Sequence, residues 1–155
     1  MNIKEMIYGG DKTTQGILAE GWWGSYQWKV CSMGSHPCGY VSIPDHHPLR
    51  GKLDLLEQYI SCHGGVTFYD RRIDWGWGTE YYIGWDYAHA GDFKAGYDQD
   101  GDKYTTEYVM NECYYVIGQL EMYERVHALF EMDTFISKDM LRELIGDWVP
   151  LLLFF

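Results

Sequence analysis

The chain has 155 residues, which is the size of one ordinary domain, so we expect a single domain over residues 1–155. Hydrophobic residues make up 46% of the chain and aromatic residues 17%, a composition that can build a core and argues against disorder. The formal net charge of −11 argues against nucleic acid as a partner, because phosphate backbones are bound by Lys and Arg.

The cysteines and the two ends of the chain bear on its compartment. Cys31, Cys38, Cys62 and Cys113 form no CxxC pair and no regular disulfide framework, so we expect buried thiols. Residues 1–10 contain Lys4 and Glu5 instead of an unbroken apolar stretch, which argues against a signal peptide and favours a cytoplasmic protein. The apolar residues 149–155 are too few to span a membrane, which takes about 20 residues. We expect them to pack in the core or to join copies of the chain in a homo-oligomer.

The first part of the chain is predicted to be rich in short strands. Residues 13–20 are typical of a short helix that Gly21 ends. Apolar and polar side chains then alternate over residues 26–30, which predicts a half-buried strand. Residues 38–43 predict a second strand, and Pro44, Pro48 and Gly51 predict a loop over residues 45–51.

The middle of the chain is predicted to extend again after one or two helical turns over residues 53–60. Residues 62–69 are expected to be extended, with a bulge at their two glycines. Residues 73–77 and 81–85 predict a hairpin that leads the chain into the polar segment 86–92.

From Thr105 the hydrophobic period becomes helical and predicts a long helix over about residues 105–125, with Thr105 or Thr106 as its N-cap. A shorter C-terminal helix is expected after Ser137. Strands followed by helices favour an α+β fold, in which the two helices cover one face of a largely antiparallel sheet.

The segment after residue 85 is the best candidate for a site. Asp86, His89 and Asp92 are spaced by three residues, so a turn would bring two carboxylates and an imidazole to one side, next to Trp85. Such a group could bind a metal ion or hold the histidine between carboxylates. The alternative is structural: the aspartates cap turns, and His89 bonds to a backbone carbonyl.

Two other histidine segments are candidates for the same pocket. His63 precedes Gly64 and Gly65, which would let a ligand approach the backbone closely. Of two adjacent histidines in the 45–51 loop, we favour His47, since neighbouring side chains on an extended backbone point to opposite sides. The alternatives are a histidine satisfied at a bulge for His63 and an exposed loop histidine for His47.

The remaining patterns assign no cofactor. Alternating carboxylates over residues 98–102 resemble a calcium loop, but the sixth and twelfth positions hold Lys103 and Val109 instead of Gly and Glu. We therefore expect an acidic turn. No dinucleotide, P-loop or zinc-hydrolase motif occurs. The seven tryptophans exceed what a core of this size needs, so some could stack on a base, although cross-strand packing explains most of them.

A series of short motifs resembles a group of small proteins of bacteriophages and bacteria that have no established activity. The motifs are Gly39-Tyr40-Val41, His47-Pro48-Leu49 with Gly51, His63-Gly64-Gly65-Val66-Thr67, Gly84-Trp85-Asp86 with Ala88-His89 and Gly91-Asp92, Glu107-Tyr108-Val109, and Glu112-Cys113. The resemblance covers roughly residues 39–120. It implies a phage-associated context, and thus the cytoplasm of a bacterial host, and it supports a site at these positions without naming a reaction.

Three functions remain open. The leading hypothesis is a phage-associated accessory protein that binds a small polar ligand, such as a nucleotide-derived host defence signal, with His63, Gly64, Gly65, Trp85, Asp86, His89, Asp92 and His47. The second is a hydrolase that uses His89, Asp86 and His63 in the same pocket, with or without a metal ion on Asp86, His89 and Asp92. The third is an acidic inhibitor of a host defence enzyme.

Overall fold

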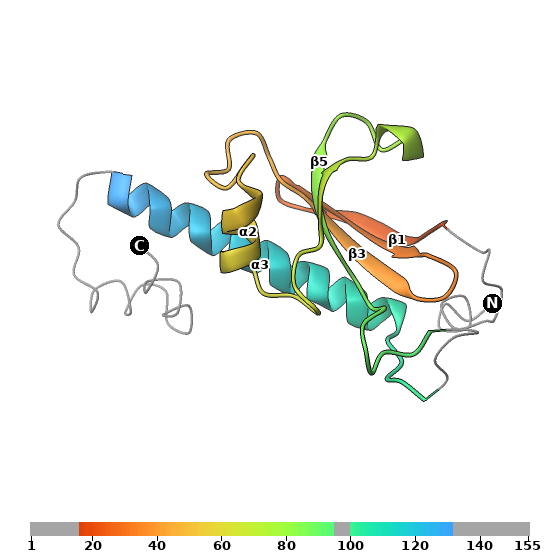
Figure 1. Ribbon diagram of the computed structural model, residues 1–155. Coiled ribbons are helices and arrows are strands. Elements are labelled where there is room, and N and C mark those ends of the chain that lie inside the picture. The colour runs from red at the N-terminus through yellow and green to blue at the C-terminus, as the bar shows by residue number, and fades with distance from the viewer. Residues whose placement is uncertain (1–15, 95–99, 132–155) are drawn as a thin grey trace.

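A computed structural model describes residues 16–94 and 100–131, and its main feature is one antiparallel sheet of five strands. The strands lie in the order β1-β2-β3-β5-β4 (Figure 1). They are β1 (Gly16–Trp23), β2 (Tyr26–Ser32), β3 (Pro37–Ser42), β4 (Phe68–Arg71) and β5 (Tyr81–Asp86). The helices are α2 (Leu53–Tyr59), the 3₁₀ turn η1 (Ile73–Trp75) and α3 (Thr106–Glu131). The predicted α+β class is confirmed.

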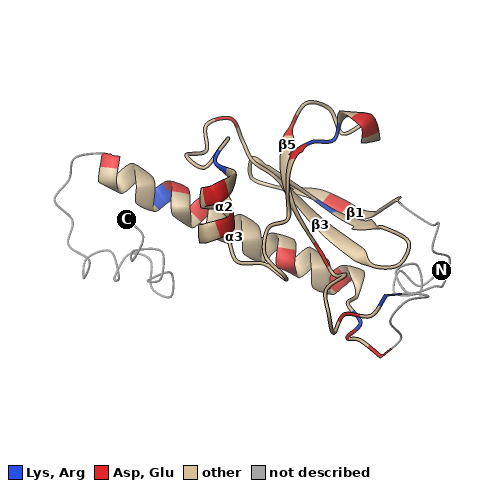
Figure 2. Cartoon of the chain, in the orientation of Figure 1, with Lys and Arg blue, Asp and Glu red and all other residues tan. Residues whose placement is uncertain are grey.

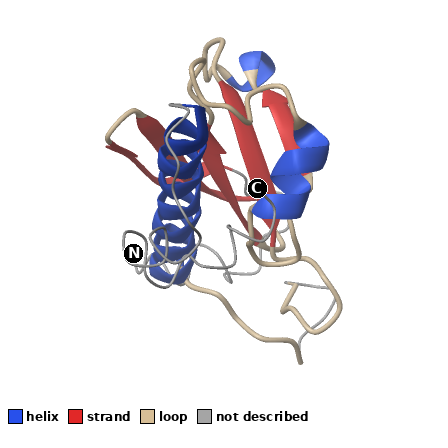
Figure 3. Cartoon of the chain, turned by 90° about the vertical axis from the view of Figure 1, so that its left-hand side faces the viewer, coloured by secondary structure: helices blue, strands red, loops and turns tan. Residues whose placement is uncertain are grey.

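The long helix α3 covers one face of the sheet, which we call the inner face (Figure 3). Side chains alternate between the two faces along each strand, so every second residue points toward α3. The inner-face residues form the main core with the buried side of α3, namely Trp28, Val30, Val41, Ile83 and Trp85 with Val109, Cys113, Val116, Ile117 and Leu120. A second, smaller core lies on the opposite, outer face and contains Cys31, Cys38, Tyr40 and Tyr82.

The start of α3 agrees with the sequence pattern. The backbone N–H of Tyr108 donates to the hydroxyl of Thr105 at 3.0 Å, which makes Thr105 the N-cap and satisfies one of the free donors of the first turn. The helix ends at Glu131, six residues beyond the predicted end at 125. The second predicted helix, after Ser137, and the apolar residues 149–155 lie outside the described residues.

Residues 16–20 were expected to be helical, and this is wrong, because they belong to β1. Glu20 pairs with Lys29 and Gly21 with Trp28, so the neighbouring strand β2 supplies the hydrogen bonds that decide the conformation. Residues 13–15 of the same predicted helix lie outside the described residues.

The predicted hairpin of residues 73–77 and 81–85 is also wrong in its first half. Residues 73–75 form the 3₁₀ turn η1, which Gly76 ends in the left-handed conformation at φ 77°. The neighbours of β5 are β3 and β4, with Phe68 opposite Gly84. The chain between β4 and β5 turns Trp75 and Trp77 toward Tyr40 on the outer face, so aromatic packing replaces strand pairing there.

Across residues 16–94 and 100–131, no helix combines the length and the apolar character that crossing a membrane requires.

The ring of Trp85 packs against the backbone of β3 because Gly39 lies opposite it. The two residues pair directly, and a methyl group built at Gly39 would overlap the six-membered ring of the indole. Trp85 is 1% exposed, so the ring has no room to move away. The Trp85 indole thus holds β5, which leads into the candidate site, against the backbone of β3 at Gly39.

Replacing Gly39 by alanine should therefore destabilise the fold. We expect Gly39→Ala to lower the free energy of unfolding by about 1–3 kcal/mol, the usual cost of overfilling a tight core. Urea denaturation would measure the change. The loss should be smaller in a Trp85→Phe background, because the overlapping atoms are then absent. An equal loss in both backgrounds would contradict this explanation.

Candidate functional site

The central contact of the site joins His63 to Asp92. His63 Nε2 lies 2.8 Å and 3.0 Å from the two carboxylate oxygens of Asp92. The same carboxylate accepts the backbone N–H of His89 at 3.0 Å. The side chain of Asp92 is only 5% exposed, and a buried carboxylate needs such hydrogen bonds. Two predicted site segments, 29 residues apart, are therefore brought together here.

The ring of His63 is fixed from several sides. It stacks on Tyr87 with centroids 4.4 Å apart, and Tyr104 meets it edge-on at 4.9 Å. Its backbone N–H donates to the carboxylate of Glu112 on α3. These contacts come from the residue after β5, from α3 and from the segment before α3, so the ring position depends on the whole fold rather than on one loop.

The second ring nitrogen of His63 is available to a ligand. Nε2 faces a carboxylate and so carries a proton, which leaves a lone pair on Nδ1 in the neutral imidazole. Within the described part of the chain, no group hydrogen-bonds to Nδ1, and the side chain keeps 22% of its surface exposed. An oriented acceptor therefore faces solvent.

His89 forms a second imidazole–carboxylate contact with Asp86 next to the first. Nε2 of His89 lies 3.3 Å from Asp86 Oδ1, but the angle is not that of a hydrogen bond, so the contact is electrostatic. The His63 and His89 rings are 5.7 Å apart. A methyl group built at Gly64 would overlap the His89 ring, which explains why this ring lies so close to the backbone of the turn after His63.

The four polar side chains do not converge on a common point. Asp92 faces His63, whereas His89 contacts Asp86. In residues 16–94 and 100–131, no group of three or more His, Cys, Asp and Glu side chains is arranged to hold a metal ion. The geometry therefore gives no support to a metal site on Asp86, His89 and Asp92.

The segment before α3 closes the loop that carries Asp92. The backbone N–H of Phe93 donates to Asp102 O at 2.8 Å, and the N–H of Asp102 donates to Gly91 O at 2.7 Å. The ammonium group of Lys94 donates to the carbonyls of His89 and Asp92. Asp102, the last residue of the predicted acidic turn, thus holds the loop of Asp92 in place.

His36 lies near this cluster, although the sequence pattern did not indicate it. It sits in the turn between β2 and β3, and its Nδ1 is 2.8 Å from the hydroxyl of Ser35. Burial lowers the pKa of His36, and the negative charges of Asp86 and Asp92 act in the opposite direction. The only signal that could have found it is the pairing of β3 with β5, which no local motif reveals.

Two of the predicted ligand-binding residues support the site from inside. Trp85 is buried in the main core, and its indole N–H donates to the hydroxyl of Tyr87 at 3.1 Å, so it holds the tyrosine on which His63 stacks. Gly65 closes the turn after His63 by donating its N–H to Cys62 O at 2.9 Å.

His47 is not part of this cluster. Its Nε2–H donates to Leu120 O at 2.8 Å, and its Nδ1 accepts the N–H of Leu49 at 3.0 Å, so both ring nitrogens are used. Leu120 lies eight residues beyond Glu112 on α3, which corresponds to about 12 Å at 1.5 Å per residue. His47 is a buried histidine that ties its loop to α3.

Comparison of the chain with protein-family models, curated proteins and solved structures gives no match. The resemblance to bacteriophage proteins and the expected phage-associated context therefore stay predictions.

The contact between Gly64 and His89 can be tested with a matched pair of variants. Gly64 and Gly65 both have positive φ, 70° and 83°, but only Gly64 has the His89 ring within reach of a methyl group. Each alanine should cost about 1–2 kcal/mol for the left-handed backbone. Only Gly64→Ala should also shift the imidazole resonances of His89 in an NMR spectrum. Equal shifts in both variants would contradict the geometry.

The buried His47 predicts a pH dependence of stability. Burial lowers the pKa of His47, so the folded protein keeps the ring neutral while the unfolded chain takes up a proton near pH 6.5. This contribution to stability is complete above that pH and is lost as the pH falls below it. His47→Gln should show a smaller loss of unfolding free energy between pH 7 and pH 5 than the wild type, measured by urea denaturation.

His46→Gln, which changes the exposed neighbour on the same loop, is the control for that experiment. An equally steep loss in His47→Gln and in the wild type would exclude His47 as the source.

Proposed function

We propose that this protein binds a small polar molecule, of a nucleotide-derived kind, at the cluster of His63, Asp86, His89 and Asp92. The observation that carries the proposal is the fixed imidazole of His63, whose Nε2–H is bonded to a buried carboxylate while Nδ1 faces solvent. A hydrogen-bonding group that is held in place before the ligand arrives loses little entropy on binding. Such convergent polar groups on a rigid frame are typical of ligand sites.

The neighbours of His63 support the same proposal. The His89 ring, 5.7 Å away, offers a second imidazole to the same ligand. The N–H of Tyr87, next to Asp86, donates to the carbonyl of Pro37 at 3.2 Å, so His36, the residue before Pro37, offers a third imidazole near the cluster. Imidazoles donate or accept hydrogen bonds according to their protonation, so they suit a ligand that carries both kinds of polar group, such as a phosphorylated sugar with hydroxyls.

Hydrolysis is the second candidate, and the geometry of the His63–Asp92 pair favours it. A carboxylate that holds one ring nitrogen of a histidine leaves the other nitrogen as a general base for water, with the carboxylate stabilising the imidazolium that forms. In this protein Asp92 would orient the ring, and Nδ1 of His63 would take the proton. The same atoms thus support binding and catalysis, and only the fate of the ligand separates the two.

An acidic inhibitor remains the third prediction. Asp and Glu residues occur along α2, along α3 and in several loops (Figure 2). A net charge of −11 suits a partner with a positively charged surface, but the same charge also keeps a protein soluble. The oriented His63 has no role in such a function.

Binding can be tested with the 5′-monophosphates and the 2′,3′-cyclic and 3′,5′-cyclic monophosphates of the four ribonucleosides. Isothermal titration calorimetry should detect at least one of these probes. His63→Gln and Asp92→Asn should each weaken it about 10- to 150-fold, which corresponds to the 1.5–3 kcal/mol of a hydrogen bond to a charged group. The control is His127→Gln, which removes an imidazole on α3 outside the cluster. This variant should bind the probe as the wild type does.

Chromatography of the probe after the protein is denatured separates the two candidates. An unchanged probe supports binding, and a product that His63→Gln does not form supports hydrolysis. If no probe binds, or if His63→Gln and Asp92→Asn bind like the wild type, the proposed function is wrong.

A further inference from the structure

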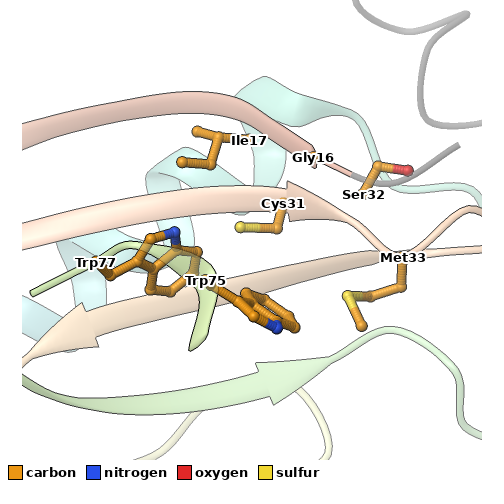
Figure 4. A pocket seen from close by; sticks show the side chains of 7 residues that line it. All are labelled: Gly16, Ile17, Cys31, Ser32, Met33, Trp75 and Trp77. Atoms are coloured by element: carbon orange, nitrogen blue, oxygen red, sulfur yellow. The ribbon is translucent and has the colours of Figure 1, made fainter. Parts of the chain in front are cut away.

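A separate cavity of about 290 Å³ lies on the outer face of the sheet, away from α3 (Figure 4). Three of its lining residues, Cys31, Met33 and Trp77, belong to or pack against the smaller core of that face. The full lining consists of Gly16, Ile17, Cys31, Ser32, Met33, Trp75 and Trp77. None of these residues is in the His63 cluster, so the cavity is a distinct feature of the protein.

The walls of the cavity suit a flat ring. The indoles of Trp75 and Trp77 stand edge to face, with centroids 5.2 Å apart and planes at 84°. Both rings also meet Tyr40 edge-on, so their directions are fixed by the sheet. Burial raises the pKa of Cys31 to about 12, which keeps its thiol uncharged at neutral pH. The cavity is therefore uncharged at Cys31. A ring bound in it would contact the faces and edges of the two indoles on one side.

Two positively charged side chains contact the rings of the two tryptophans. The guanidinium of Arg72 is 4.0 Å from the Trp75 ring centroid, and the ammonium of Lys29 is 5.0 Å from the Trp77 centroid. Lys29 is paired with Glu20 at 2.6 Å, whereas no carboxylate of the described residues pairs with Arg72. In a chain with a net charge of −11, this is a local surplus of positive charge, which suits a ligand that carries a negative group.

The cavity and Asp86 of the His63 cluster lie at the same end of the outer face of the sheet. Cys31 pairs with Cys38, and Cys38 pairs with Asp86, so all three side chains point to the outer face. Two strand spacings separate Cys31 from Asp86, which is about 10 Å. The turn between β2 and β3 joins the two sites, since Met33 lines the cavity and its N–H donates to the carbonyl of His36 at 2.9 Å.

We infer that the outer-face cavity receives the flat heteroaromatic ring of the ligand whose polar part is bound by the His63 cluster, and that this ring is a nucleobase or a ring of that size. The inference rests on the proposed function and specifies its ligand. Ligand pockets start at roughly 300 Å³, so the cavity holds one ring system and leaves the sugar and phosphate outside. The sugar and phosphate then leave the cavity toward the turn that carries His36, which joins the two sites.

The test uses nucleosides and their 5′-monophosphates as probes of the full chain, with adenosine and AMP, guanosine and GMP, cytidine and CMP, and uridine and UMP. Trp75→Ala should weaken binding of both members of a pair about 5- to 150-fold, which corresponds to 1–3 kcal/mol of base stacking. Trp22→Ala is the matched control, because Trp22 lies on β1 outside the cavity and is 63% exposed. It should leave the affinities unchanged.

Ile17→Glu provides a second variant, since Ile17 is partly exposed at the rim and the substitution leaves the core intact. It should weaken nucleoside binding, with an unchanged urea unfolding midpoint. His63→Gln should weaken the monophosphates and spare the nucleosides.

The outcomes distinguish the two proposals. If His63→Gln weakens AMP or another monophosphate but Trp75→Ala and Ile17→Glu do not, the ring site is wrong and the proposed function stands. If the cavity variants lose the nucleosides and His63→Gln changes nothing, the ring site stands and the proposed function is wrong. Failure of every probe to bind the wild type overturns both.

Discussion

The buried carboxylate of Asp92 is the group on which the site depends. It accepts hydrogen bonds from the ring of His63 and from the backbone of His89, and the segment next to it pairs with Asp102 just before α3. Losing one partner would leave a charge in a place that water hardly reaches, which is far costlier than losing an exposed pair. Three loops therefore have to be in position together, and this constraint explains the fixed direction of the His63 ring.

Much of the fold could be predicted from local patterns. The alternation around Tyr26 and the helical period after Thr105 gave correct elements. The strand was expected to be half-buried, but β2 is buried on both faces because the smaller core covers its outer face. The failures are segments whose conformation is set by a distant neighbour. Residues 16–20 form a strand because β2 lies beside them, and residues 73–77 turn because their tryptophans pack on Tyr40.

The site was predictable only in part, for the same reason. The small residues around His63 and the polar segment after Trp85 indicated two places that the fold joins. Nothing local distinguishes His47, whose ring nitrogens are bonded to the backbone of Leu120 and of Leu49, from His36, which precedes the strand that pairs with β5. Whether a histidine supports the structure or faces a ligand is decided by tertiary contacts, and these depend on strand order rather than on neighbouring residues.

The strand order also governs when the site can exist during folding. The β1-β2-β3 meander closes through short turns, but β5 joins β3 only when Ser42 meets Tyr82, forty positions later. Such long-range pairing is slow, because the chain loses the entropy of closing a large loop before any stabilising contact forms. His63 finds its supports only after β5 and α3 have both docked. A chain still leaving the ribosome can thus form its first hairpins early, but it acquires the ligand-facing imidazole among its last native features.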